Sequence, residues 1–109
     1  MTYEQISEML AQVGIPYAYY QFPNDSGQQP PFLCFYYSND GDFKADNTNY
    51  QKIEALTIEL YTDSKDFDLE QSVEGILTEH DLVYSRDETV IDSEQMHLTT
   101  YYTEVIINA

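Results

Sequence analysis

Apolar residues near the start of the chain are spaced as on one face of a helix. Within residues 2–13 they fall at positions i, i+3, i+4 and i+7, namely Ile6, Met9, Leu10 and Val13. Thr2 and Gln5 have the spacing of a capping box, which marks where a helix begins. Gly14 supplies a natural C-terminal stop. The pattern predicts a helix over residues 2–13.

A second helical pattern occurs beyond the middle of the chain. Its apolar stripe consists of Leu69, Val73, Ile76 and Leu77. We expect this helix to begin at a cap formed by Asp66 or Asp68 and to end near Glu79. His80 lies at the end of the helix dipole where a cation is favourable.

The other apolar segments have the length and composition of strands, since they are rich in aromatic and β-branched residues. The predicted strands are 17–22, 32–38, 52–62, 82–86 and 95–107. Residues 23–31 are rich in turn formers, so the first two strands are expected to form a hairpin. Residues 87–93 are polar and are predicted to form a turn.

These elements predict one α+β domain over residues 1–109, in the order α-β-β-β-α-β-β. We expect a mostly antiparallel sheet with both helices packed on one face. The other face would carry tyrosines, drawn from Tyr36, Tyr37, Tyr61, Tyr101 and Tyr102. Tyrosine is common at protein interfaces, so this face is a candidate binding surface. Alternatively, cross-strand aromatic pairs stabilise a solvated sheet.

Charge narrows the choice of partners. The chain has twenty acidic residues and four basic ones, for a net charge of -16. Such a surface repels nucleic acid phosphates and anionic membranes. Proteins and cations remain as partners. The acidity favours a merely soluble surface, a DNA mimic, or a surface that DNA passes without adhering.

Residues with catalytic chemistry are not arranged in a known motif. The four glycines are scattered, and His80 and His97 lie on different elements without metal-ligand spacing. Cys34 lies in the apolar run 32–36, which indicates a buried thiol that acts as a small hydrophobe. We therefore expect no enzymatic activity, no metal and no cofactor.

The polar segment 39–49 contains Asp40, Asp42 and Asp46. Clustered carboxylates can bind calcium, but the spacing does not match an EF-hand, and a solvated turn is the simpler interpretation. The first residues lack the pattern of a signal peptide, and no apolar run is long enough to span a membrane. A cytoplasmic protein is expected.

The layout resembles the small minor structural proteins of tailed phages and prophages of Gram-positive bacteria, of the siphophage tail-terminator or tail-completion type. The segments that carry the resemblance are 2–10, Gly14-Ile15-Pro16-Tyr17, 53–62 leading into 69–77, and 96–108. The resemblance implies a non-enzymatic subunit of a homo-oligomeric ring, typically a hexamer, which caps the tail tube and joins it to the head. Its partners would be copies of itself and other tail or head-completion proteins. It would be found in the host cytoplasm during assembly and in the virion tail if phage-encoded.

That role would require contact surfaces, and the sequence offers candidates for them. The candidate interface residues are Tyr36, Asp40, Asp42, Asp46, Tyr61, Tyr101 and Tyr102. Two other functions remain open. One is an acidic inhibitor or DNA mimic. The other is a small ligand-binding regulatory module, in which the aromatic residues of segment 17–22 line a pocket instead of packing on the first helix.

Overall fold

A computed structural model of the chain describes residues 1–23, 26–38 and 52–108. The helices are α1 (Tyr3–Ala11) and α2 (Phe67–Glu79), with a short 3-10 turn η2 (Asp92–Glu94). The strands are β1 (Tyr17–Tyr19), β2 (Phe32–Ser38), β3 (Lys52–Thr62), β4 (Tyr84–Ile91) and β5 (Met96–Ile107). The element order predicted from the sequence is confirmed.

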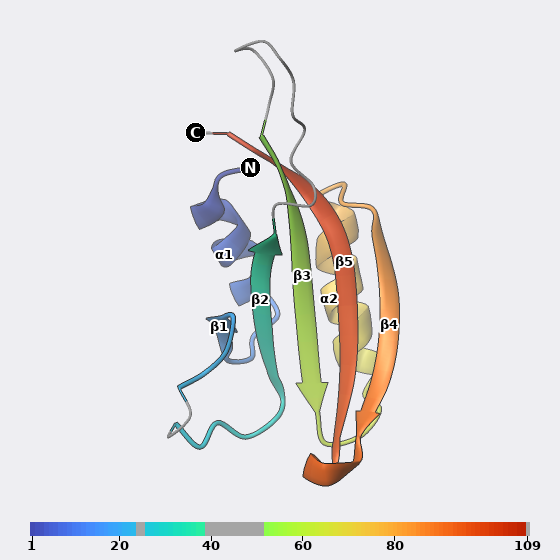
Figure 1. The fold of residues 1–109 in the computed structure, drawn as a ribbon. Coiled ribbons are helices and arrows are strands. Elements are labelled where there is room, and N and C mark those ends of the chain that lie inside the picture. The colour runs from blue at the N-terminus through green and yellow to red at the C-terminus, as the bar shows by residue number, and fades with distance from the viewer. Residues whose placement is uncertain (24–25, 39–51, 109) are drawn as a thin grey trace.

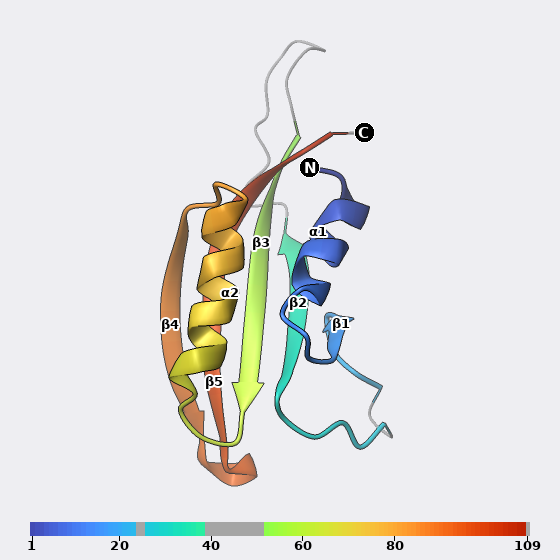
Figure 2. The same cartoon turned by 180° about the vertical axis from the view of Figure 1, so that it is seen from behind.

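The strands form one sheet in the order β1-β2-β3-β5-β4 (Figure 1). All neighbours are antiparallel except β1 and β2. Both helices lie on the same face of this sheet, as the view from behind shows (Figure 2). The predicted α+β class, with two helices on one face, is therefore confirmed. No helix in the described part of the chain is both long enough and apolar enough to cross a membrane.

The helix ends follow from local chemistry. The Thr2 hydroxyl accepts a hydrogen bond from the Gln5 amide, and the Gln5 side chain accepts one from the Thr2 amide, which completes the capping box. Gly14 has a positive φ of 87°, the conformation that glycine favours after a helix. At α2 the cap is Asp66, whose carboxylate accepts from the Leu69 amide at 3.0 Å.

One hydrophobic core fills the space between the sheet and the helices. The stripe of α1, the stripe of α2 and alternate positions of β2, β3 and β5 contribute to it. Its fully buried members include Ile6, Leu10, Leu33, Leu56, Ile58, Leu60, Val73, Leu77, Tyr101 and Val105. The period of two along a strand places these residues on the helix-covered face and their neighbours on the other face.

The predicted hairpin of the first two strands is wrong. β1 and β2 are parallel, with Tyr17 opposite Leu33 and Tyr19 opposite Phe35. Tyr20 has a φ of 71°, which turns the chain out of the sheet. The next strand, β2, starts at Phe32 at the same end of the sheet as β1, because the two strands are parallel. A dozen residues are enough for such a crossover, and alternation of side chains carries no information about strand direction.

The predicted turn over residues 87–93 is also wrong in most of its length. β4 continues to Ile91, and every residue from Tyr84 to Ile91 is opposite a residue of β5. β4 is an edge strand, and every residue between its first and last residues is exposed. Polar residues therefore suit it, because charges on an edge strand discourage unwanted pairing.

Candidate functional site

The sheet face opposite the helices is the main candidate surface. Register places its side chains in rows that cross the sheet. One row is Phe32, Tyr61, Leu98 and Thr89. The next is Cys34, Glu59, Thr100 and Asp87. The third is Tyr36, Thr57, Tyr102 and Ser85. We call this surface the uncovered face.

The predicted interface tyrosines divide between the two faces. Tyr36, Tyr61 and Tyr102 lie on the uncovered face. Tyr101 does not, because it is opposite Ile58, is fully buried, and packs beneath α2. Tyr37 likewise belongs to the helix side, where its ring centroid lies 5.1 Å from that of Tyr3. Adjacent residues of a strand point to opposite faces, so Tyr101 and Tyr102 could not both lie on one surface.

The remaining interface candidates lie beyond what the structure describes. Asp40, Asp42 and Asp46, together with the calcium site considered for segment 39–49, fall among residues 39–51, outside the described ranges.

Two parts of the uncovered face differ in character. Toward the end of β5 lies an apolar patch, which we define as Ile53, Tyr102 and Ile106. Ile53 and Ile106 are directly opposite each other on β3 and β5. Ile106 is 49% exposed and Tyr102 is 44% exposed. Side chains of this kind gain free energy when a partner removes them from water.

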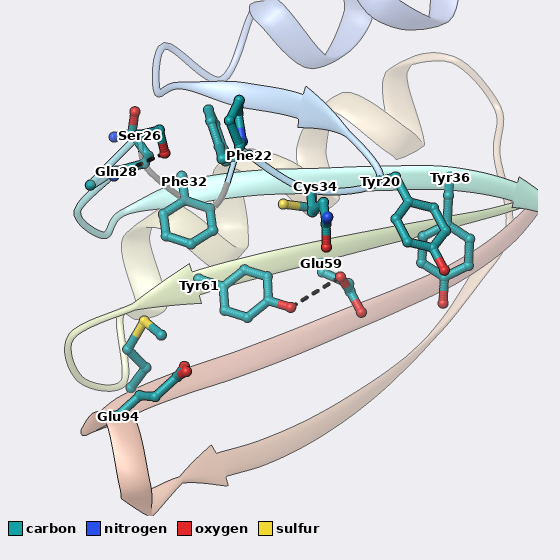
Figure 3. Close-up of a pocket in the computed structure, with 14 residues that line it drawn as sticks. Tyr20, Phe22, Ser26, Gln28, Phe32, Cys34, Tyr36, Glu59, Tyr61 and Glu94 are labelled. Atoms are coloured by element: carbon teal, nitrogen blue, oxygen red, sulfur yellow. Dashed lines mark hydrogen bonds between the residues drawn. The ribbon is translucent and has the colours of Figure 1, made fainter.

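A pocket of about 670 Å³ lies over the rows of Phe32 and Glu59 and reaches Tyr36 in the third row (Figure 3). The segment that follows β1 forms one wall, β2 and β3 form the floor, and η2 borders the far side. Its lining includes five aromatic residues and two carboxylates, namely Tyr20, Phe22, Phe32, Tyr36, Tyr61, Glu59 and Glu94. The rest of the lining is a mixture of polar and small or apolar residues, among them Gln21, Ser26, Gln28 and Met96. The aromatics of segment 17–22 thus divide, since Tyr20 and Phe22 line the pocket while Tyr17 packs against the core.

The floor of this pocket is held in place by aromatic contacts and one hydrogen bond. The rings of Phe32 and Tyr61 stack with their centroids 4.8 Å apart. The Tyr61 hydroxyl donates to Glu59 Oε1 at 3.1 Å. Burial and the neighbouring Glu59 carboxylate raise the pKa of Tyr61 well above its usual value. The phenol therefore remains a hydrogen-bond donor at neutral pH.

Cys34 lies in the pocket floor and is 4% exposed. Burial, reinforced by the charge of Glu59, raises the pKa of its thiol from 9.0 to about 11. The nucleophilic form of cysteine is the thiolate, which is scarce at neutral pH under these conditions. The expectation that Cys34 is a buried thiol is confirmed, and its environment does not activate it.

A polar network on the helix-covered face joins α2 to β4 and β5. Glu70 is 2% exposed and accepts hydrogen bonds from Lys65 Nζ at 2.8 Å and from Thr99 Oγ1 at 3.1 Å. Arg86 bridges Glu70 at 3.3 Å and Glu74 at 3.0 Å. These contacts supply the positive charge that a buried carboxylate requires.

The same network includes a group of potential metal ligands. Single ligand atoms of Glu70, Glu88 and His97 lie within 4.8 Å of one another. The Lys65 ammonium, however, donates to both Glu70 and Glu88. Those two hydrogen bonds raise the pKa of Lys65, so the lysine stays charged. Lysine thus occupies the position that a cation would need, and the group fits a structural ion-pair network better than a metal site.

This network was not predicted from the sequence. A usable signal was present, because Lys65 and Arg86 are two of only four basic residues in the chain. In so acidic a protein, scarce cations are expected beside carboxylates that become buried. The two histidines have separate roles: His80 Nδ1 lies 2.9 Å from the Ile76 carbonyl at the end of α2, and His97 contacts Glu88.

Comparison with known proteins adds no assignment. No protein-family model matches the chain, and no curated protein gives a significant match.

Proposed function

We propose that this chain is a non-enzymatic structural subunit that associates with copies of itself into a ring, as a tail-terminator or tail-completion protein of a phage or prophage. The observation that carries the proposal is the apolar patch. Tyr102 and Ile106 are nearly half exposed on a sheet face that neither helix covers. Ile106 adjoins Ile53 across the sheet, and Glu104 lies between Ile106 and Tyr102 on the same face. Exposed apolar side chains gathered on one face mark interaction surfaces. The element order, which is that of the resembled family, supports the phage role.

A ring also requires a second surface, because a closed head-to-tail interface joins two different patches of each subunit. A tyrosine cluster at the β1 edge is suited to this role. Tyr3 and Tyr19 are 43% and 52% exposed, and both contact Tyr37 with ring centroids 5.1 and 5.7 Å away. This cluster and the apolar patch lie on opposite faces of the sheet, so one copy can present either surface to its neighbour.

The net charge of -16 fits a subunit beside a DNA path. DNA phosphates are repelled by an acidic lining and bound by a basic one. The same charge opposes contact between subunits. Added salt should therefore strengthen self-association, since the screening length falls from ~30 Å at 0.01 M salt to ~8 Å at 0.15 M.

The test is the absolute mass in solution, measured by light scattering after size exclusion at low and high salt. We expect a ring-sized species that grows with salt in the wild-type chain. The double variant Tyr102→Ser/Ile106→Ser should shift the mass toward the monomer, because it removes the two exposed apolar side chains of the patch.

Phe67→Ser is the matched control, since Phe67 is 66% exposed but lies at the start of α2 on the helix layer. It should leave the mass unchanged. A monomer at every salt concentration, or a double variant that associates as the wild type does, would contradict the proposal.

A further inference from the structure

Glu59 occupies an unusual position in the floor of the pocket. Its row on the sheet lies between the row that contains Phe32 and Tyr61 and the row that contains Tyr36. The Phe32 and Tyr61 rings stack on one side, and on the other side Tyr20 and Tyr36 meet with centroids 5.6 Å apart. A single carboxylate is therefore flanked by two aromatic pairs, as Figure 3 shows.

No cation of the described chain neutralises this carboxylate. Within the described ranges, Glu59 receives one hydrogen bond, from the Tyr61 hydroxyl, and forms no ion pair. Glu94 adds a second carboxylate at the border of the pocket and likewise forms no ion pair among those residues. The basic side chains Lys65 and Arg86 are engaged on the opposite face of the sheet. The pocket thus combines negative charge with π-faces, and no basic residue is among the described residues that line it.

This combination matches the chemistry of a guanidinium group. Cations are attracted to the faces of aromatic rings, and arginine is found there more often than lysine. A guanidinium is planar, is less strongly hydrated than an ammonium, and donates hydrogen bonds in a fork that suits carboxylates. Glu59 would accept such hydrogen bonds while the neighbouring rings pack against the guanidinium plane.

The source of the cation follows from the sequence and from the size of the pocket. Arg86 is the single arginine in the chain, and it is bound to Glu70 and Glu74. A second copy is therefore a poor donor of arginine. The pocket, at about 670 Å³, is larger than one side chain and is continuous with the uncovered face. It has room for an arginine together with adjoining backbone, which indicates a different protein.

We infer that the pocket between the segment after β1 and η2 is a docking site for an arginine side chain of a partner protein, with Glu59 as the main acceptor. The inference rests on one part of the proposed function, namely that the chain works by binding other proteins. It adds that one partner presents a basic surface and is not a copy of this chain. The site shares no residue with the apolar patch, although Tyr36 of the pocket and Tyr102 of the patch lie in the same row of the sheet, on β2 and β5.

The test is a titration of the full-length, isotope-labelled chain followed by amide NMR shifts. The probe is the capped tripeptide Gly-Arg-Gly, and the comparison peptide contains citrulline in place of arginine. Citrulline keeps the shape of the side chain but has no charge. We expect saturable shifts at pocket residues with the arginine peptide and binding of the citrulline peptide at least ~10-fold weaker.

Three variants locate the site. Glu59→Gln should weaken arginine binding ~10-fold. Tyr20→Ser, at a side chain 64% exposed and therefore safe for folding, should weaken it a few-fold. Glu104→Gln removes the same charge from the same face outside the pocket and should leave binding unchanged.

Three results would overturn the inference. The first is equal binding of the arginine and citrulline peptides. The second is an arginine response that Glu59→Gln leaves intact, and the third is the absence of any saturable response. Light scattering on the same samples separates the two proposals: loss of arginine binding with self-association retained removes only the docking site. Arginine binding without self-association supports the docking site and contradicts the ring.

Discussion

The two faces of the sheet show how one strand can serve stability and recognition at once. Tyr101 and Tyr102 are neighbours on β5 and have the same chemistry. Tyr101 is fully buried, and its hydroxyl donates to Glu74 at 2.8 Å. Tyr102 is 44% exposed on the uncovered face. The difference arises from the two-residue period of a strand, which assigns one tyrosine to the core and the other to the surface.

The carboxylates of the two faces differ in the same manner. Glu70, on the helix-covered face, is bound by Lys65 and Arg86. Glu59, on the uncovered face, is bound only by a phenol among the residues that the structure describes. Two of the four basic side chains of the sequence, Lys65 and Arg86, thus form ion pairs with one buried glutamate. Charge that is neutralised within the fold contributes to stability, whereas charge that is left unneutralised is available to a partner.

A matched pair of isoleucines gives the largest expected difference between the faces. Ile58→Ala should lower the free energy of unfolding by about 3–4 kcal/mol, because it leaves a cavity in the core. Ile106→Ala, at a side chain 49% exposed, should cost less than about 1 kcal/mol. Urea denaturation at low protein concentration measures both. If both variants lost the same free energy of unfolding, the two faces would not differ in burial. If the loss for Ile106→Ala grew with protein concentration, Ile106 would lie in an interface between copies.

The reactivity of the Cys34 thiol reports how well the pocket floor is shielded from water. At pH 8, alkylation of the native thiol should be at least ~100-fold slower than in the unfolded chain, because its raised pKa of about 11 keeps it protonated. The unfolded thiol ionises first as the pH rises. The stabilising contribution of the neutral thiol is therefore complete below about pH 9 and is lost toward pH 11.

Urea denaturation at pH 8 and pH 10 checks the sign of this effect. The wild-type chain should lose more stability between these two values than Cys34→Ala, which has no thiol to ionise. Rapid alkylation of the native protein, or identical pH profiles, would mean that the floor of the pocket is open to water.

The two glutamates give the smallest difference in stability. Glu70→Gln should destabilise the fold by about 1–2 kcal/mol, since it leaves Lys65 and Arg86 with fewer acceptors. Glu59→Gln should change the free energy of unfolding by less than about 0.5 kcal/mol, because no cation depends on it among the described residues. Thermal and urea unfolding compare the two variants. A larger loss of unfolding free energy for Glu59→Gln than for Glu70→Gln would contradict the assignment of Glu70 to stability and Glu59 to binding.

Both helices and the positions of β2, β3 and β5 could be predicted from local patterns, whereas β1 is shorter and β4 longer than predicted. The capping box of Thr2 and Gln5 and the stripe of α1 depend on residues a few positions apart, so the sequence displays them directly. The same holds for the alternation in β3, where Leu56, Ile58 and Leu60 are all buried. Interactions between residues a few positions apart can be recognised without information about the rest of the chain.

Strand direction and the pocket could not be predicted in this way. The parallel pairing of β1 with β2 depends on how the chain connects the two strands, which no alternation pattern encodes. The pocket unites Phe22, Tyr61 and Glu94, which are separated by more than thirty positions along the chain. Its aromatic composition was visible in the sequence, but its concave shape was not.

The sequence by itself determined the α+β class, the helix limits to within a few residues, the burial of Cys34 and the excess of negative charge. These properties follow from composition and from short-range periodicity. Which tyrosines face outward, which carboxylates receive the few cations, and where the apolar patch and the pocket lie follow only from the tertiary structure. The physical reason is that a side chain's exposure and its charge partners depend on residues from distant strands, which only the register of the folded sheet brings together.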